Sequence, residues 1–367
     1  MLHQRHCGPQ QSHGARGGSS IRDFPLALLS TIYGLLVRSR YQLYGWGIFP
    51  TQKLPAKVVC VGNMTMGGTG KTPMVEYTAR TLRDLGMRVA VLSRGYKGKM
   101  EKSVGVVSDG KNILLSQEES GDEPYLLAHR LEGIPVLVGG GRFRSGMMAH
   151  EHFDIQVAVL DDGYQHVQLH RDMNILLVNG REGFGNGHLL PWGCLREPLT
   201  GLTRADHFLI TKTELRDKTE AIEKTLRHWN SKAPIFHGRY VPEHICDPQS
   251  GRRDRPVAIK GKRILAFAGL ADPDDFFELL RSLGAVLVET IIFPDHHRYT
   301  ESDLRILGQK IPGVDWVLTT EKDMVRLQSL NLEGLPIRVL TIRMEIADED
   351  TLREALFTGL SGPEAAA

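Results

Sequence analysis

The residues from Thr65 to Thr72 combine glycines, a lysine and a threonine at a spacing that suits phosphate binding. The segment reads TMGGTGKT, and it follows the apolar run VVCV and precedes a helical pattern. Glycines let the backbone turn with its N–H groups directed inward, so that a phosphate can lie against unshielded amides. The lysine would contact the β- and γ-phosphates, and the threonine hydroxyl would reach Mg²⁺. The segment is therefore predicted to be a P-loop between a strand and a helix.

One position departs from the usual P-loop pattern, which has a glycine where this chain has Thr65. Threonine restricts the turn, but Gly-Lys-Thr between a strand and a helix is a specific combination. Arg94 follows the predicted strand at residues 88–92, and the carboxyl end of such a strand faces the ligand crevice of an open α/β sheet. The residues expected to bind the nucleotide are Thr65, Met66, Gly67, Gly68, Thr69, Gly70, Lys71, Thr72 and Arg94.

An acidic pair, Asp161 and Asp162, follows a second apolar strand at residues 157–160. Mg²⁺ needs hard oxygen ligands, and P-loop enzymes place a carboxylate at this edge of the sheet. The expected metal ligands are therefore Thr72, Asp161 and Asp162. Three further arginines are candidates for contact with the γ-phosphate or an acidic substrate group: Arg142, Arg144 and Arg196.

A kinase differs from a nucleotide hydrolase in having a base that reaches an alcohol. Asp122 precedes a helical run at residues 125–131, where it could act as a catalytic carboxylate or simply as a helix cap. The loop PDHHRYT offers His296 and His297. Adjacent histidines cannot both face one ligand on a helix or strand, so a two-histidine metal site is disfavoured. Asp122 and His296 are the preferred catalytic candidates.

The composition points to a cytosolic, two-domain protein of the α/β class. At 367 residues the chain is too long for one comfortable core, and a net charge of +2 argues against a dedicated nucleic-acid binder. Its four cysteines show no paired spacing, so neither a disulfide framework nor a zinc site is indicated. Strand and helix patterns alternate on both sides of a proline-rich stretch. The expected segments are a disordered extension (1–20), a membrane-associated helix (21–49), a P-loop domain (50–232), a linker or β-ribbon (233–261) and a second α/β domain (262–360).

Residues 24–44 carry one apolar helical stripe, with Arg38 and Arg40 near its end. A helix that spans a bilayer needs ~20 continuous apolar residues, and this run is shorter. The stripe is better suited to lying in one leaflet, with the arginines on the anionic cytoplasmic side. The alternative is a helix packed on the protein's own core.

Several sequence blocks together resemble the tetraacyldisaccharide 4'-kinase family, the lipid A 4'-kinases of Gram-negative bacteria. The blocks are GNMTMGGTGKTP, LSRGYKG, GDEPYLLA, VLDDGYQH, PWGCLREP, FPDHHRYT and TTEKDMVRL. The resemblance implies an ATP- and Mg²⁺-dependent enzyme that phosphorylates the 4'-hydroxyl of a tetraacylated glucosamine disaccharide 1-phosphate, giving lipid IVA. It also implies a P-loop kinase-like α/β/α domain and a second, smaller α/β domain joined by a ribbon, with the active site between them and an N-terminal helix on the inner membrane.

The resemblance also suggests roles for individual residues. Asp122 matches the family's catalytic aspartate, and a histidine of the DHH block, preferably His296, matches its partner. Asp161 and Asp162 match the acidic pair on the metal side, and His166 is expected near that pair. The implied partners are the lipid substrate and the cytoplasmic surface of the inner membrane, with no nucleic acid and a monomeric enzyme.

Two other functions fit parts of the sequence. A P-loop ATPase or GTPase that acts as a switch or metallochaperone would use the same loop, and Thr211-Lys212 after a strand faintly resembles a base-recognition motif. A soluble small-molecule kinase would also use it. Neither explains the apolar helix at residues 24–44.

Overall fold

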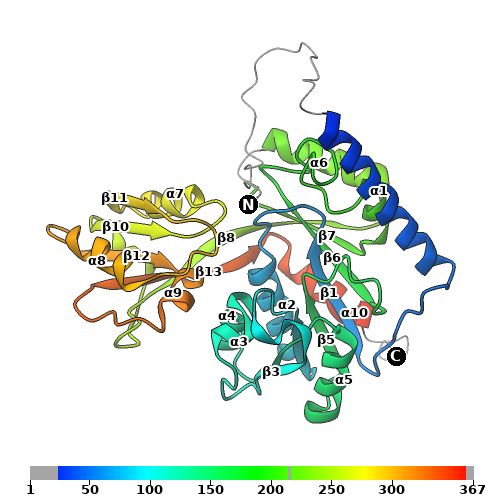
Figure 1. Ribbon diagram of the computed structural model, residues 1–367, viewed down its shortest axis with the longest axis horizontal. Helices are drawn as coiled ribbons and strands as arrows, with labels where there is room; N and C mark the ends of the chain where they lie inside the picture. Colours follow the sequence, from blue (N-terminus) through cyan, green and yellow to red (C-terminus); the bar gives the residue numbers. More distant parts are fainter. Residues whose placement is uncertain (1–23, 214–215, 361–367) are drawn as a thin grey trace. The chain divides into compact units, whose positions relative to one another are not determined.

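The structure, a computed structural model, describes residues 24–213 and 216–360 (Figure 1). The extension expected to be disordered, residues 1–20, lies outside this part of the chain. Contacts between residues divide the chain into two compact units. Of the described residues, unit 1 contains 24–94, 141–213, 216–239 and 345–360, and unit 2 contains 95–140 and 240–344.

Unit 1 is built on a parallel sheet with the strand order β8-β7-β6-β1-β5-β2. The bounds are β1 Lys57–Asn63, β2 Val89–Ser93, β5 Val157–Asp161, β6 Met173–Asn179, β7 His207–Thr211 and β8 Ile235–Cys246. Every residue of β2, β5, β6 and β7 is buried. Strands of this kind form when both faces of a parallel sheet are covered, which is why they read as continuous apolar runs in the sequence.

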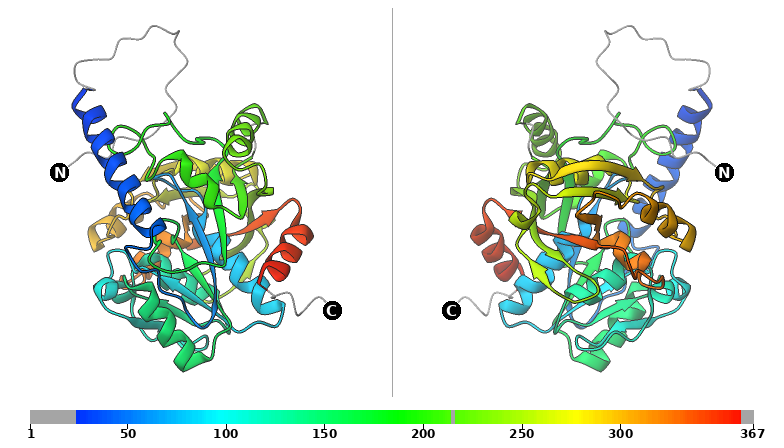
Figure 2. Two further views of the ribbon diagram at one scale, coloured as in Figure 1. Left: turned by 90° about the vertical axis from the view of Figure 1, so that its right-hand side faces the viewer. Right: turned by 90° about the vertical axis from the view of Figure 1, so that its left-hand side faces the viewer.

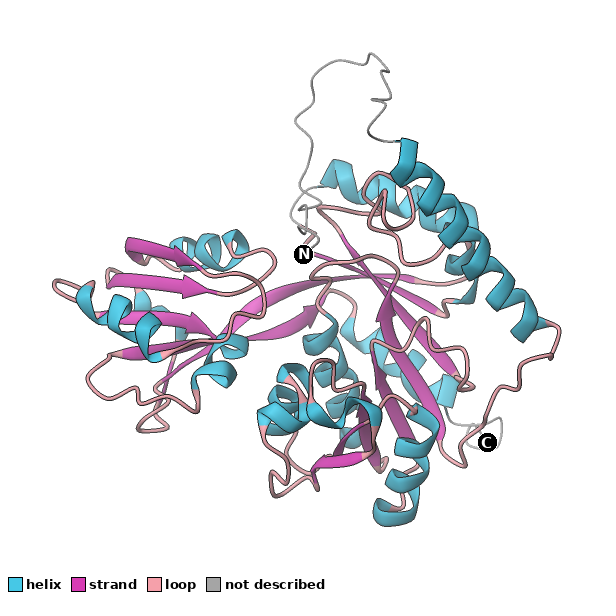
Figure 3. Ribbon diagram, in the orientation of Figure 1, coloured by secondary structure: helices cyan, strands magenta, loops and turns pink. Residues whose placement is uncertain are grey.

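The described residues of unit 1 form five α-helices; Figure 3 colours the helices cyan. Their bounds are α1 Phe24–Gly45, α2 Lys71–Asp84, α5 Arg142–Phe153, α6 Arg216–Trp229 and α10 Glu349–Leu360. Helix α2 buries Met74, Val75, Ala79 and Leu82, and it contacts β1, β2 and β5. These residues recur at helical spacing, so one face of α2 packs on the sheet while its first turn stays at the strand ends.

Unit 2 contributes another run of parallel strands to the sheet, with the order β11-β10-β12-β13. Its strands are β10 Arg263–Ala268, β11 Val286–Ile292, β12 Trp316–Thr320 and β13 Ile337–Ile346, and its helices α7 Asp274–Ser282, α8 Glu301–Gln309 and α9 Glu321–Leu327. Alternate residues of β10 enter different cores: Ile264 and Ala266 pack with Phe277 of α7, whereas Leu265 packs with Leu304 of α8. The two-residue period of a strand thus places apolar side chains on both faces.

Residues 95–140 also belong to unit 2, although the sequence suggested that they lie within a P-loop domain at 50–232. They form the antiparallel pair β3 Gly105–Ser108 and β4 Val136–Val138, and the helices α3 Gln117–Ser120 and α4 Asp122–Arg130. Helix α4 packs against α9, where Glu123 pairs with Lys322 at 2.7 Å and Arg130 pairs with Glu321 at 2.9 Å. These contacts join segments about 200 residues apart in the chain. The order of strands and helices along the sequence does not predict such contacts.

The long strands β8 and β13 are neighbours in the sheet, and each contributes residues to both units. They form the ribbon that joins the two α/β units, and β8 also pairs with the short strand β9 Arg253–Asp254. The expected fold class is confirmed. Short 3₁₀ helices complete the described elements: η1 Lys99–Lys102, η2 Leu199–Arg204 and η3 Pro256–Ile259.

Candidate functional site

The P-loop connects β1 to α2 in unit 1. Gly67 and Gly70 have φ angles of 113° and 83°, in the left-handed region that glycine adopts without steric cost. Gly70 is also the N-cap of α2 and supplies no side-chain cap. The first N–H groups of α2 therefore point toward the loop, where the positive end of the helix favours an anion.

A second segment holds the beginning of the P-loop in place. Thr65 forms an antiparallel bridge with Leu195, and the Met66 N–H donates to the Cys194 carbonyl at 2.8 Å. A bridged residue has an extended backbone, so Thr65 needs none of glycine's freedom. The departure from the usual pattern is thus accommodated by pairing with the PWGCLREP segment.

Opposite charges meet at the end of β5. The Lys71 Nζ lies 3.3 Å from the Asn63 Oδ1 and 3.8 Å from the Asp162 Oδ1. The Arg196 Nη1 donates to both carboxylate oxygens of Asp162, at 2.9 and 3.1 Å. Asp161 accepts a hydrogen bond from the Ser93 hydroxyl at 2.8 Å. The structure therefore brings the P-loop lysine together with Asp162 and Arg196, as the strand ends of a parallel sheet predict.

The expected metal ligands are oxygen donors of Thr72, Asp161 and Asp162. Thr72 and Asp161 are buried, and Asp162 is partly exposed. No group of three or more His, Cys, Asp or Glu side chains within 24–213 and 216–360 is placed to hold a metal ion. Mg²⁺ commonly takes one or two carboxylates and completes its shell with water and substrate phosphate, so a hydroxyl and two carboxylates fit its chemistry.

The remaining arginines expected near phosphate differ in exposure. Arg94 is exposed after β2, Arg142 is 3% exposed and Arg144 is exposed. Arg142 and Arg144 lie in the first turn of α5. The pKa of His166 is lowered to about 4, mainly by burial and then by the charges of Arg142 and Arg171. His166 is therefore neutral at pH 7, beside a group of cations.

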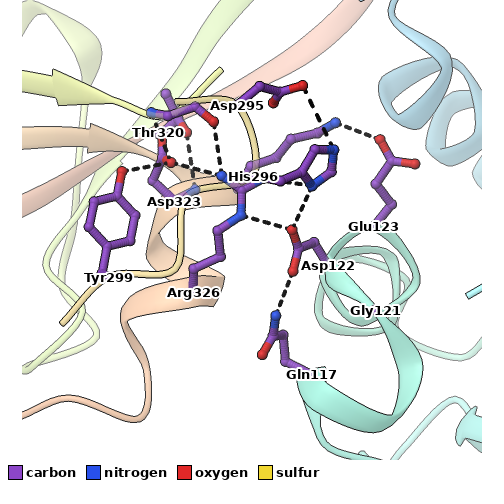
Figure 4. A network of polar contacts seen from close by, with 12 residues as sticks. Gln117, Gly121, Asp122, Glu123, Asp295, His296, Tyr299, Thr320, Asp323 and Arg326 are labelled. Carbon is purple, nitrogen blue, oxygen red and sulfur yellow. Dashed lines mark hydrogen bonds and ion pairs between the residues drawn. The ribbon is translucent and has the colours of Figure 1, made fainter. Parts of the chain in front are cut away.

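Asp122 and His296 lie in contact within unit 2. Asp122 opens α4 after Gly121, whose φ of 90° makes the sharp turn into the helix. The His296 Nδ1 is 3.1 Å from the Asp122 Oδ2, whereas the His297 Nε2 is 3.1 Å from the Asp303 Oδ2, in the cap of α8 (Figure 4 shows the His296 contact). The geometry thus assigns the two adjacent histidines to different carboxylates.

Two other residues complete the surroundings of the Asp122 carboxylate. The Arg326 Nε donates to Oδ2 at 2.8 Å, and the Gln117 amide donates to Oδ1 at 2.5 Å. Burial by itself would raise the pKa of Asp122. The hydrogen bond from His296 and the charge of Arg326 outweigh this effect and hold the pKa of Asp122 well below its usual range.

Comparison with known proteins identifies the family. The model of the Tetraacyldisaccharide-1-P 4'-kinase family matches residues 22–361. The chain belongs to this family. It is 40% identical to the tetraacyldisaccharide 4'-kinase of Desulfatibacillum aliphaticivorans, over 96% of each chain, and 42% identical to that of Syntrophus aciditrophicus, over 88% of this chain and 90% of the relative. LpxK from Aquifex aeolicus, crystallised in complex with ATP, superposes with a TM-score of 0.76 at 32% identity, covering 93% of this chain and 100% of that chain.

Membership in the 4'-kinase family confirms the resemblance on which the sequence interpretation was based. The sequence interpretation missed two contacts of Asp122, those with Arg326 and Gln117. The sequence analysis included Arg326 only as part of the block TTEKDMVRL. Nothing in the sequence of a short helix indicates that one of its arginine side chains is buried. Its partner could be found only from the packing of α4 against α9.

Proposed function

We propose that this chain is an ATP-dependent kinase that transfers the γ-phosphate of ATP to the 4'-hydroxyl of tetraacyldisaccharide 1-phosphate. The product would be lipid IVA, an intermediate of lipid A biosynthesis. Family membership supports the activity. The structural observation that carries it is the Asp122 carboxylate, held at the start of α4 against His296, because a kinase needs a base for the acceptor alcohol and a hydrolase or switch does not.

The donor side of the reaction belongs to unit 1. The amides at the start of α2 and the Lys71 ammonium bind the β- and γ-phosphates, and Arg196 and Arg94 supply further positive charge. On binding, the phosphates compete with Asp162 for Lys71, whose Nζ lies 3.8 Å from the Asp162 carboxylate. When bound, Mg²⁺ supplies additional charge neutralisation, with Thr72, Asp161 and Asp162 as the residues that hold it.

The acceptor side depends on Asp122. The 4'-oxygen of the sugar attacks the γ-phosphorus, the bond from that phosphorus to the bridging β–γ oxygen breaks, and ADP leaves. The hydroxyl proton passes to the Asp122 carboxylate. His296 orients this carboxylate through its Nδ1 contact. Positioning and charge neutralisation do most of the work in such a transfer, so a fixed carboxylate matters more than a strong base.

Helix α1 is proposed to bring the enzyme to the cytoplasmic surface of the inner membrane, as a peripheral or monotopic element. Its small residues face the protein: Ser30 donates to the Leu189 carbonyl at 2.8 Å, and a Cβ on Gly34 would lie 2.7 Å from the Leu189 side chain. Four of its leucines are exposed, and Leu35 and Leu36 are 55% and 66% exposed. The helix runs along the outside of unit 1 (Figures 1 and 2).

One face of α1 thus packs on unit 1, and the exposed leucines lie on the opposite face. The outward stripe continues into exposed residues after the helix, with Trp46 71% and Ile48 59% exposed. None of the described helices has the length and apolar character needed to cross a membrane. An outward apolar face of this kind suits a lipid surface, and a substrate with four acyl chains stays in the bilayer because each buried methylene contributes about 0.8 kcal/mol.

Radiolabelled ATP tests the proposed function against its alternatives. The full chain is incubated with γ-³²P-ATP and a lipid extract that contains the disaccharide acceptor, with a Lys71→Met variant as the negative control. Label in a chloroform-soluble disaccharide supports the lipid kinase. Release of inorganic phosphate alone supports an ATPase or GTPase switch, and label in a water-soluble metabolite supports a soluble small-molecule kinase.

A further inference from the structure

Residues 188–197 form a loop of unit 1, called the bridging loop below, that contacts α1 as well as the P-loop. Backbone bonds within the loop hold it together: the Leu195 N–H donates to the His188 carbonyl at 3.1 Å, and the Leu190 N–H donates to the Leu195 carbonyl at 2.9 Å. Leu195 is also the residue that forms the bridge with Thr65 of the P-loop. The position of the bridging loop is therefore linked directly to that of the P-loop.

The backbone of Arg196, within the bridging loop, is held by one hydrogen bond on each side. Its N–H donates to the carbonyl of Met64, the residue between β1 and the P-loop, at 2.8 Å. Its carbonyl accepts from the hydroxyl of Tyr33, in α1, at 2.7 Å. Burial, and then the charge of Glu197, raises the pKa of Tyr33, so the hydroxyl keeps its proton and remains a donor. Arg196 is thus tied to the P-loop segment and to α1.

Helix α1 contacts this region at two further positions. The Ser30 hydroxyl donates to the Leu189 carbonyl at 2.8 Å. The Arg204 guanidinium lies 4.5 Å from the centroid of the Tyr41 ring, and it pairs with the fully buried carboxylate of Glu197 at 2.5 Å. Residues 30, 33 and 41 recur at helical spacing, so one face of α1 lies on the bridging loop and the residues that follow it.

The side chain of Arg196 reaches the nucleotide side of unit 1. Its Nη1 donates to both carboxylate oxygens of Asp162, and the Lys71 Nζ lies 3.8 Å from the same carboxylate. By neutralising Asp162, Arg196 leaves the Lys71 ammonium available to the phosphates of ATP. The position of the guanidinium therefore affects how tightly ATP binds.

We propose that Tyr33 is a positioning residue for Arg196: through its hydroxyl, α1 holds Arg196 beside Asp162 and Lys71. This inference rests on the proposed function, because it takes the P-loop as the ATP site. Helix α1 then serves the reaction with two faces. The exposed leucines, such as Leu35 and Leu36, are proposed to bind lipid, and Tyr33 on the packed face fixes a cation of the ATP site.

Tyr33→Phe tests the proposal because it removes the hydroxyl and keeps the ring. The measurement is equilibrium binding of the non-hydrolysable analogue β,γ-methylene-ATP, with Mg²⁺, to the full chain without lipid substrate. We expect the Kd to rise about 3- to 10-fold, which is the effect of one lost hydrogen bond. Binding to anionic vesicles should stay within about twofold of wild type, since the exposed leucines are unchanged. An unchanged Kd for the analogue would overturn the proposal.

Tyr44 provides a matched control, because the same substitution can be made in the same helix. Its ring packs edge-on against Phe49 at 5.3 Å, near the end of α1. Tyr44→Phe should leave the Kd for the analogue within about twofold of wild type. An equal rise of the Kd in Tyr44→Phe would show that any loosening of α1 weakens binding, and it would overturn the specific role of Tyr33.

A double-mutant cycle tests whether Tyr33 acts through Arg196. Arg196→Gln should raise the Kd about 10-fold or more, because it removes the cation that neutralises Asp162. Adding Tyr33→Phe to Arg196→Gln should then change the Kd less than about twofold, since the group that Tyr33 positions is already absent. If the two effects multiply instead, Tyr33 acts by another route and the proposal fails. Absence of lipid phosphorylation by the wild type would refute the proposed function, while the binding measurements would still test Tyr33.

Discussion

Replacement of Asp122 with asparagine removes the proposed proton acceptor while keeping nearly the same shape. The asparagine oxygen, placed where Oδ2 lies, can still accept from the Arg326 Nε and the His296 Nδ1. Its amide nitrogen then faces the Gln117 amide, which can rotate to present its oxygen. The fold should therefore survive at a cost of about 1–2 kcal/mol, since charge-assisted bonds become ordinary ones.

The chemical step should suffer much more than the fold. A positioned base contributes about 10²- to 10⁴-fold to the rate, which corresponds to about 3–5 kcal/mol of barrier. For Asp122→Asn we therefore expect kcat to fall by this factor. ATP affinity should stay within about twofold, because a base acts in the transition state and not in nucleotide binding. The assay is steady-state transfer of ³²P to the disaccharide lipid, together with equilibrium binding of ATP to the same protein.

The chain offers a matched control for this variant. Asp303 of α8 and His297, which follows His296 in the same loop, form a carboxylate–imidazole pair with the same 3.1 Å separation. Asp303→Asn weakens the cap of α8, at a cost of about 1 kcal/mol, and should leave kcat within about threefold of wild type. A loss of ATP affinity as large as the loss of kcat in Asp122→Asn would assign Asp122 to nucleotide or metal binding. Equal losses of kcat in the two variants would refute the choice of His296 over His297.

Two further predictions concern unit 1. The double variant Leu35→Asp/Leu36→Asp should lower binding to anionic vesicles about 100-fold or more while ATP binding is unchanged, because burial of each exposed leucine in the lipid would contribute about 1.5–3 kcal/mol. Ser39→Asp is the control at an exposed polar position. Unchanged sedimentation of the double variant with vesicles would contradict the membrane role of α1. The pKa of His166 is lowered from 6.5 to about 4. Between these pH values the histidine of the unfolded chain binds a proton and that of the folded chain does not, so the free energy of unfolding should fall as the pH drops. The loss is on the order of 3 kcal/mol, and urea unfolding of His166→Gln should show a shallower decline, whereas parallel pH curves would refute it.

The sequence predicted the elements of unit 1 well because its central strands are fully buried. Such strands must be apolar throughout, and the chemistry-bearing residues follow them directly, as Asp161 and Asp162 show at the end of β5. The meeting of Lys71 with Asp162 could therefore be expected, since both follow adjacent parallel strands.

The surroundings of Asp122 could not be predicted in this way. Asp122 and Arg326 are 204 residues apart, and their contact depends on α4 packing against α9. Neither helix is long, and neither has a sequence pattern that names its neighbour. For the same reason, the grouping of residues 95–140 with unit 2 had no signal in the alternation of strands and helices.

The contacts of Asp122 set a limit on how it can contribute to catalysis. A carboxylate that accepts from Arg326, His296 and Gln117 is a weaker base than an exposed one, because each donor stabilises its charge. If base strength dominated the rate, removal of the Arg326 charge should raise the plateau of kcat. If orientation dominates, as expected for a loose phosphoryl-transfer transition state, the plateau should fall even though the base becomes stronger. The sign of the change in Arg326→Met at alkaline pH therefore decides between the two contributions.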